Sequence, residues 1–268
     1  MEVLMSRTPV IFIHGLWLHA SSWQPWVDLF NEAGYDAMAP GWPGDAETVE
    51  AARATPDAVA NFGVDDVTVH YEKVITGLSA KPILVGHSFG GLIVERLVGE
   101  DLAAAGVAID AAPIKGVLPL PISALRVAFP ALRNPGNIDA AVSLTGEQFH
   151  YAFGNAITPE ESAELFERWT IPSPARPLFQ AATANFNPHS QTKVDTHKQE
   201  RGPLLITMGG KDHTVPEAIS KSTYKKYRKS SAVTDLTEFE DRGHSLTIDR
   251  GWQEVADSVL TWLKAKNL

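Results

Sequence analysis

The stretch that decides the fold is PILVGHSFGGLIVERLV, residues 82–98. It begins with a short apolar, β-rich run, and the residues after Gly91 are apolar at helical spacing. Between these two parts lies the pentapeptide GHSFG (residues 86–90), a G-x-S-x-G pattern. A strand–turn–helix with this pattern is strained and brings neighbouring backbone close, so glycines flank the serine. The pattern predicts that Ser88 is a nucleophile at the carboxyl end of a strand.

The composition indicates a globular enzyme-sized domain with few special features. The chain has 268 residues, 44% of them apolar and 21% charged, enough to bury a large core in one α/β domain. It has no apolar run of about 18 residues, so we expect no membrane span. The residues before the first strand, Met1 to Pro9, are too few for a secretory signal.

The cysteine content and the net charge exclude several kinds of chemistry and of binding partner. Cysteine is absent, which excludes disulfides, thiolate chemistry and cysteine-ligated metals and fits a cytoplasmic protein. A net charge of −9 argues against nucleic acid as a partner. The basic cluster at residues 221–229 is interpreted as the solvated face of a surface helix.

Apolar runs and amphipathic stretches alternate along most of the chain. We expect strands at residues 10–13, 35–39, 82–86, 106–110, 203–208 and 234–239, and helices at residues 22–33, 64–78, 91–100, 216–229 and 252–265. The strands read as unbroken apolar runs, which is typical of a parallel sheet covered on both faces. The sequence therefore predicts an α/β fold with a doubly wound, mostly parallel sheet of about six strands flanked by helices.

This alternation is interrupted between residues 113 and 198, where prolines are frequent and no clear strand is expected. We interpret residues 1–112 and 199–268 as a core domain and 113–198 as an inserted helical cap. The segment is rich in aromatic side chains, and Phe129, Phe149 and Phe153 are predicted to line a substrate pocket. The alternative is that these side chains form only the core of the cap. Trp17 and His19, which follow the first strand, are further predicted pocket residues.

A nucleophilic serine needs a base, and the base needs an orienting carboxylate. Because catalytic groups gather at the carboxyl ends of parallel strands, we considered Asp and His residues that follow strands. Asp212 follows the run at 203–208, and His244 follows the run at 234–239. Their order along the chain, Ser…Asp…His, is the one expected for this motif. Asp110, at the end of another strand, is the rival acid; its other interpretation is a cap for the turn into the inserted segment.

Four segments together make the chain resemble the α/β-hydrolase fold family. Residues 86–90 match the nucleophile turn of that family, and 209–216 (GGKDHTVP) resemble its acid loop. Residues 243–244 resemble its histidine loop and 14–15 its oxyanion loop. The resemblance covers nearly the whole chain and is weakest at 113–198, where the family inserts its cap. The N-terminal hairpin that many members carry has no room here, because only eight residues precede Pro9.

The resemblance implies a role for each matching residue. Ser88 corresponds to the nucleophile, His244 to the general base and then acid, and Asp212 to the residue that orients the imidazole. The backbone N–H groups of Leu16 and Phe89 correspond to the oxyanion hole, where one donor contributes about 2.7–4 kcal/mol in the transition state.

Other histidines are given structural roles. His14 is expected to pack behind the oxyanion loop, and His87 to point away from the nucleophile and support the turn. His213 has no companion ligand at metal spacing, so no metal is assigned.

These features lead to one functional hypothesis and two alternatives. The first is a serine hydrolase that cleaves an ester, or a lactone or thioester-like acyl bond, of a small and largely apolar substrate through an acyl-enzyme on Ser88. No cofactor is expected, and the protein would be a monomer or homodimer acting on a small molecule. One alternative is a cofactor-free C–C hydrolase, lyase or perhydrolase that uses the same triad. The other is a non-catalytic ligand-binding protein on the same fold.

Overall fold

The computed structural model describes residues 7–268. Six strands form one sheet in the order β2-β1-β3-β4-β7-β8, and every neighbouring pair is parallel. The strands are β1 (Pro9–Ile13), β2 (Asp36–Met38), β3 (Ile83–His87), β4 (Ala105–Ile109), β7 (Leu204–Gly209) and β8 (Thr234–Phe239). The predicted doubly wound sheet of about six strands is confirmed.

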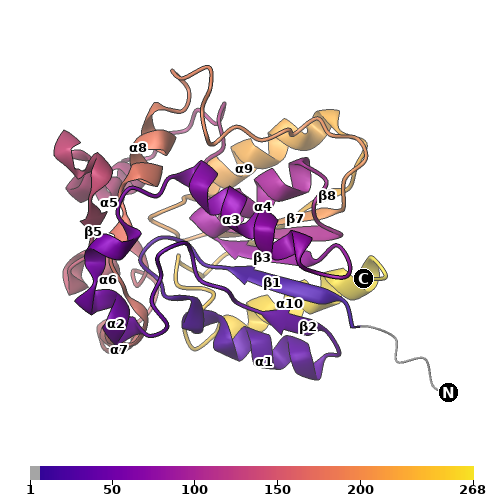
Figure 1. Ribbon diagram of the computed structural model, residues 1–268, viewed down its shortest axis with the longest axis horizontal. Coiled ribbons are helices and arrows are strands. Elements are labelled where there is room, and N and C mark those ends of the chain that lie inside the picture. Colours follow the sequence, from indigo (N-terminus) through magenta and orange to yellow (C-terminus); the bar gives the residue numbers. More distant parts are fainter. Residues whose placement is uncertain (1–6) are drawn as a thin grey trace.

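Helices cover both faces of the sheet (Figure 1). One face carries α1 (Gln24–Glu32) and α10 (Trp252–Ala265), and the other carries α3 (Val64–Thr76), α4 (Phe89–Gly99) and α9 (Glu217–Lys226). Strands β1, β3, β4 and β7 are buried at every position, because side chains on both faces meet a helical layer. Burial on both faces of the sheet is the reason why these strands are unbroken apolar runs in the sequence.

The predicted helix at residues 22–33 is divided in two. A 3₁₀ turn spans Ala20–Trp23, and α1 begins at Gln24 with Pro25 in its first turn. Proline lacks an N–H and fixes φ near its helical value, so it favours the start of a helix over its interior. The short helix α2 (Val49–Ala54) was not predicted.

The segment between β4 and β7 holds four α-helices, a 3₁₀ helix (Pro135–Asp139) and one small sheet. The α-helices are α5 (Ile122–Leu132), α6 (Gly146–Ala152), α7 (Pro159–Trp169) and α8 (Arg176–Thr183), which lie together at one end of the main sheet (Figure 1). The expectation that this segment has no strand was wrong, since β5 (Ala141–Val142) and β6 (Ser173–Pro174) pair antiparallel. Its status as an independent cap stays a prediction. Within residues 7–268, no helix has the length and apolar character needed to cross a bilayer.

Candidate active site

Ser88 lies in a strained turn between β3 and α4. Its φ is 56° and its ψ −121°, a region that residues with a Cβ seldom occupy. The turn is held by backbone bonds, because the Ser88 N–H donates to the Ile109 carbonyl (2.9 Å) and the Ser88 carbonyl accepts from the Ala112 amide (2.9 Å). Strand β4 therefore fixes the backbone on which the hydroxyl stands.

The two glycines of the pentapeptide are required by close backbone contacts. A Cβ on Gly86 would lie 2.3 Å from the Gly90 carbonyl oxygen, and a Cβ on Gly90 would lie 2.1 Å from the Ile13 carbonyl oxygen. Gly15 packs directly against Ser88, since a Cβ on Gly15 would lie 2.7 Å from the Cβ of Ser88. The loop after β1 and the turn at Ser88 are thus in close contact, and at Gly15 and Gly90 there is no room for a Cβ.

The structure brings Asp212 and His244 together. Asp212 follows β7 and His244 follows β8, and both side chains are buried. His244 Nδ1 lies 2.6 Å from Asp212 Oδ2, and Asp212 Oδ1 accepts from the amides of Thr214 (2.6 Å) and Val215 (2.8 Å). This pairing places the proton on Nδ1 and leaves Nε2, which has no partner within residues 7–268, free to act as a base.

No hydrogen bond joins Ser88 Oγ to His244 Nε2 in the described part of the chain. Such bonds are often long or misaligned in substrate-free structures and tighten in the reacting complex.

The charge on Asp212 is stabilised by its neighbours. Burial by itself would raise the pKa of this carboxyl group, but the His244 ring and the hydrogen bonds to Asp212 outweigh it and lower the pKa. Asp212 is therefore ionised at neutral pH and can stabilise a positive charge on His244.

Asp110 also lies beside the histidine, but its role differs from the predicted turn cap. Its Oδ1 accepts a hydrogen bond from the Gly209 amide (2.9 Å), which belongs to β7 and not to the turn that follows Asp110. Its Oδ2 lies 4.0 Å from His244 Nδ1. The direct hydrogen bond to the histidine goes to Asp212, whereas Asp110 is the next carboxyl group behind it.

Two aromatic rings enclose His244. The edge of the Phe153 ring packs on it at a centroid distance of 4.8 Å, and His87 lies against it at 4.4 Å. Burial, together with the nearby His244 charge, lowers the pKa of His87 well below its ordinary value, so His87 is neutral. The contact between His87 and His244 was not foreseen from the sequence.

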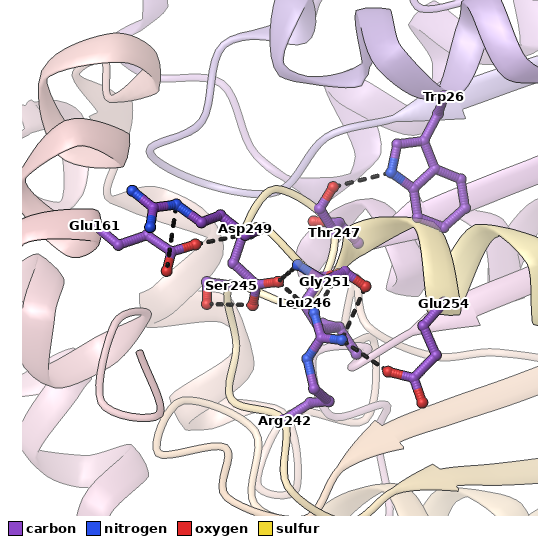
Figure 2. Close-up of polar contacts among 10 residues, drawn as sticks. Trp26, Glu161, Arg242, Ser245, Leu246, Thr247, Asp249, Gly251 and Glu254 are labelled. Carbon is purple, nitrogen blue, oxygen red and sulfur yellow. Dashed lines mark hydrogen bonds and ion pairs between the residues drawn. The ribbon is translucent and has the colours of Figure 1, made fainter. Parts of the chain in front are cut away.

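A polar network fixes the loop that carries His244 (Figure 2). The Ser245 hydroxyl donates to Asp249 Oδ2 (2.9 Å), and Asp249 also pairs with Arg242. From the inserted segment, Glu161 on α7 accepts a hydrogen bond from the Arg250 amide (2.7 Å). The histidine is thereby held by both the core and α7.

The two amides predicted to form an oxyanion hole are not used in hydrogen bonds within the described part of the chain. Phe89 is the first residue of α4 and Leu16 follows β1, and no protein group within residues 7–268 accepts a hydrogen bond from either amide. The next residue, Trp17, has a φ of 68° and donates its N–H to Ser173 Oγ (2.6 Å). The inserted segment thus holds the loop in which Leu16 lies.

A cavity of about 130 Å³ includes Ser88 in its wall. None of its lining residues is charged, and the hydroxyl groups come from Ser88 and Thr214. The other lining residues are apolar: Trp17, Phe89, Ala112, Pro113, Pro119, Leu120, Ala124, Leu125, Val127, Ala128, Leu132, Leu178, Ala181, Ala182, Val215 and Ile219.

Of the predicted pocket residues, Trp17 lines this cavity and the other four do not. His19 lies at a separate hollow and pairs with the Ala46 carbonyl oxygen (3.0 Å). Phe129 on α5 is 62% exposed and lines another hollow, whereas its neighbours Val127 and Ala128 line the cavity with Ser88. Phe149 is fully buried and stacks on Phe153, which packs against His244.

The other predicted structural residues have defined contacts. His14 stacks on Trp42 and lies 2.9 Å from Asp45 Oδ2. His213 Nδ1 lies 3.0 Å from the Tyr151 carbonyl oxygen. Both rings are thus engaged in packing and polar contacts of their own.

One acidic cluster has the composition of a metal site. Atoms of Asp110, Asp212 and His244 lie within 4.8 Å of one another. Asp212 Oδ2 already accepts a hydrogen bond from His244 Nδ1, and Oδ1 accepts from two backbone amides. The proton shared between His244 and Asp212 therefore accounts for the close approach of these groups.

Fold and site geometry together define a class, and the sequence comparison agrees with them. The model of the alpha/beta hydrolase family matches residues 10–258, so the chain belongs to this family. No curated protein is detectably similar to the chain by sequence.

Solved structures with the same fold include several named hydrolases. The monoacylglycerol lipase of Paleococcus ferrophilus is 21% identical with a TM-score of 0.66, over 97% of this chain and 96% of that one. The methylesterase MES16 from Arabidopsis is 16% identical with a TM-score of 0.67, over 96% and 99%. A pyrethroid hydrolase from Sphingobium faniae JZ-2 is 16% identical with a TM-score of 0.65, over 97% and 98%.

Proposed function

We propose that this protein is a serine hydrolase that cleaves the ester of a small, largely apolar substrate through an acyl-enzyme on Ser88. The observation that carries the proposal is the Asp212–His244 pair, joined at 2.6 Å, in a site whose serine lines an uncharged apolar cavity. The names of the structural relatives, among them a lipase and a methylesterase, support an ester as the scissile group.

Each residue has a defined step in the proposed reaction. His244 Nε2 takes the proton of the Ser88 hydroxyl as its oxygen attacks the ester carbonyl, and the imidazolium is stabilised by Asp212. The Leu16 and Phe89 amides donate to the developing oxyanion. His244 then protonates the leaving alcohol, and afterwards it activates the water that releases the acid and restores Ser88. The reaction requires no cofactor.

The cavity limits the substrate. Ligand pockets for drug-sized molecules span about 300–1,000 Å³, so a cavity of about 130 Å³ favours a small group on one side of the ester. A charged group would be desolvated there without a partner, which costs several kcal/mol. We therefore expect a short, uncharged acyl or alkyl group next to the scissile bond. Cytoplasmic location and a monomeric or homodimeric state remain predictions.

The test uses p-nitrophenyl esters of increasing acyl length. We expect turnover of short esters by the wild-type protein and a loss of at least about 10³-fold in kcat for Ser88→Ala, with Ser258→Ala on α10 as a matched control that retains activity. A fluorophosphonate should label Ser88, as seen by peptide mass. Absence of labelling would refute the assignment of Ser88 as the nucleophile. Labelling without turnover of any ester would favour the C–C hydrolase or lyase alternative.

A further inference from the structure

The second carboxyl group of the site, that of Asp110, has no role in the reaction described above. It is fully buried, and its φ of 43° places the residue in the left-handed region. Asp tolerates this region better than most residues, but the conformation still costs free energy. Because both its burial and its backbone conformation are costly, we looked for a function of this acid beside His244.

The two carboxyl groups have very different hydrogen-bond environments. Asp212 accepts from His244 Nδ1 and from two backbone amides. Asp110 accepts from one amide through Oδ1, and its buried Oδ2 has no donor within the described residues. An ionised Asp110 would thus leave a buried charged oxygen without a partner, which is costly.

A proton on Asp110 removes this cost. A carboxyl oxygen of Asp110 and one of Asp212 lie within 4.8 Å of each other, so a protonated Oδ2 can turn to donate to the Asp212 carboxylate. Two adjacent buried carboxyl groups cannot both ionise readily, and the one with fewer donors keeps the proton.

The charged groups around the pair support the same assignment. Burial, followed by the charge of Asp212, raises the pKa of Asp110 well above its ordinary range. Arg242 is the nearby cation, but its guanidinium is paired with Asp249 and Glu254.

Resting on the proposed function, we propose that Asp110 is a positioning residue that, as an un-ionised carboxylic acid, donates a hydrogen bond to Asp212, and that it becomes the acid partner of His244 when Asp212 is removed. In the intact protein, the pair carries one proton and one negative charge, and the donated bond holds Asp212 toward His244. In the absence of the Asp212 charge, Asp110 ionises more readily, and its Oδ2, which lies 4.0 Å from His244 Nδ1, needs to move by only about 1 Å to accept a hydrogen bond from it.

The first test is independent of catalysis. The infrared spectrum at pH 7 of the wild-type protein minus that of Asp110→Asn should contain the carbonyl band of a protonated carboxyl group. The exposed Asp257 on α10 provides the matched control, since Asp257→Asn removes a carboxyl group at the surface and should remove no such band. A difference spectrum in which Asp110→Asn also removes only a carboxylate signal would overturn the proposal.

The second test follows the rate at which a fluorophosphonate labels Ser88. Asparagine keeps an N–H donor toward Asp212, whereas leucine does not, so Asp110→Asn should slow labelling by less than about fivefold and Asp110→Leu by at least about thirtyfold. Thermal unfolding of both variants separates loss of fold from loss of rate. Equal, large losses in Asp110→Asn and Asp212→Asn would mean that Asp110 carries the charge, contrary to the proposal.

The third test measures the replacement of one acid by the other. Loss of the carboxylate in a Ser-His-Asp triad costs about 10⁴ in kcat. Asp212→Asn should label at least tenfold faster than the double variant Asp110→Asn/Asp212→Asn at pH 9, and this ratio should shrink toward pH 6 as Asp110 takes up its proton. Equal rates of the two variants at every pH would refute the replacement. A wild-type protein that is not labelled at all would count against the proposed function and leave the infrared result standing.

Discussion

Replacing Glu95 with glutamine should stabilise the protein at neutral pH and have little effect in acid. Glu95 lies on the nucleophile helix α4, is fully buried, and accepts a hydrogen bond from the Tyr227 hydroxyl (2.7 Å). Burial raises its pKa to about 8, although that hydrogen bond and the charge of Arg201 act in the opposite direction. The folded protein therefore holds Glu95 protonated at pH values at which the unfolded chain has released the proton.

The sign and size of the effect follow from proton linkage. With a folded pKa above the unfolded one, stability is fully present below about pH 4.5 and is lost as pH rises through the folded pKa of about 8. At ~1.4 kcal/mol per pH unit, Glu95 lowers the free energy of unfolding by about 0.8 kcal/mol at pH 5 and about 3.3 kcal/mol at pH 7. Because glutamine does not titrate, the stability of Glu95→Gln relative to wild type should rise by about 2.5 kcal/mol between these pH values.

Urea denaturation followed by tryptophan fluorescence at pH 5, 6 and 7 measures this difference. Glu32→Gln, at the exposed end of α1, is the control for the same substitution at the surface. A gap between Glu95→Gln and wild type that is the same at pH 5 and pH 7 would show that Glu95 is ionised in the folded protein and would refute the reasoning.

Three further substitutions test the packing of the site. Gly90→Ala forces a Cβ to within 2.1 Å of a backbone oxygen of β1 and should cost about 3 kcal/mol or more in unfolding free energy, whereas Gly146→Ala, with nothing nearer than 4.0 Å, should be tolerated; equal stabilities would contradict this. Phe153→Ala removes a ring that packs on His244 and should cost about 3–5 kcal/mol, measured by urea denaturation. Ser245→Ala deprives buried Asp249 of a donor and should cost about 1–3 kcal/mol; a stability equal to wild type would show that this bond does not hold the histidine loop.

The sheet could be predicted from sequence because its determinants are local. Buried strands appear as apolar runs, and the glycines at 86 and 90 mark a turn in which backbone passes backbone. Asp212 and His244 were found for a related reason, since a residue that follows a parallel strand lies at the carboxyl edge of the sheet wherever the rest of the chain goes.

The pocket could not be predicted in the same way. On α5, Phe129 is exposed whereas the neighbouring Val127 lines the cavity, and only the docking of the helix on the core decides which face turns inward. The proposed pairing of Asp110 with Asp212 could not be predicted for the same reason, because it depends on the tertiary arrangement. Each follows its own strand, but their separation depends on β4 and β7 being neighbours in the sheet, and sequence periodicity does not encode strand order.

The segment between β4 and β7 is bound by specific hydrogen bonds to the loop that follows β1 and to the loop that carries His244. Ser173 holds the Trp17 amide, next to the oxyanion loop, and Glu161 holds the Arg250 amide in the histidine loop. For a mutant library, the segment therefore contains two kinds of position. Changes along α5, such as at Leu125, should re-rank substrates by altering the wall. Changes at the two anchoring side chains should slow every substrate alike, so selectivity and turnover can be searched separately within one segment.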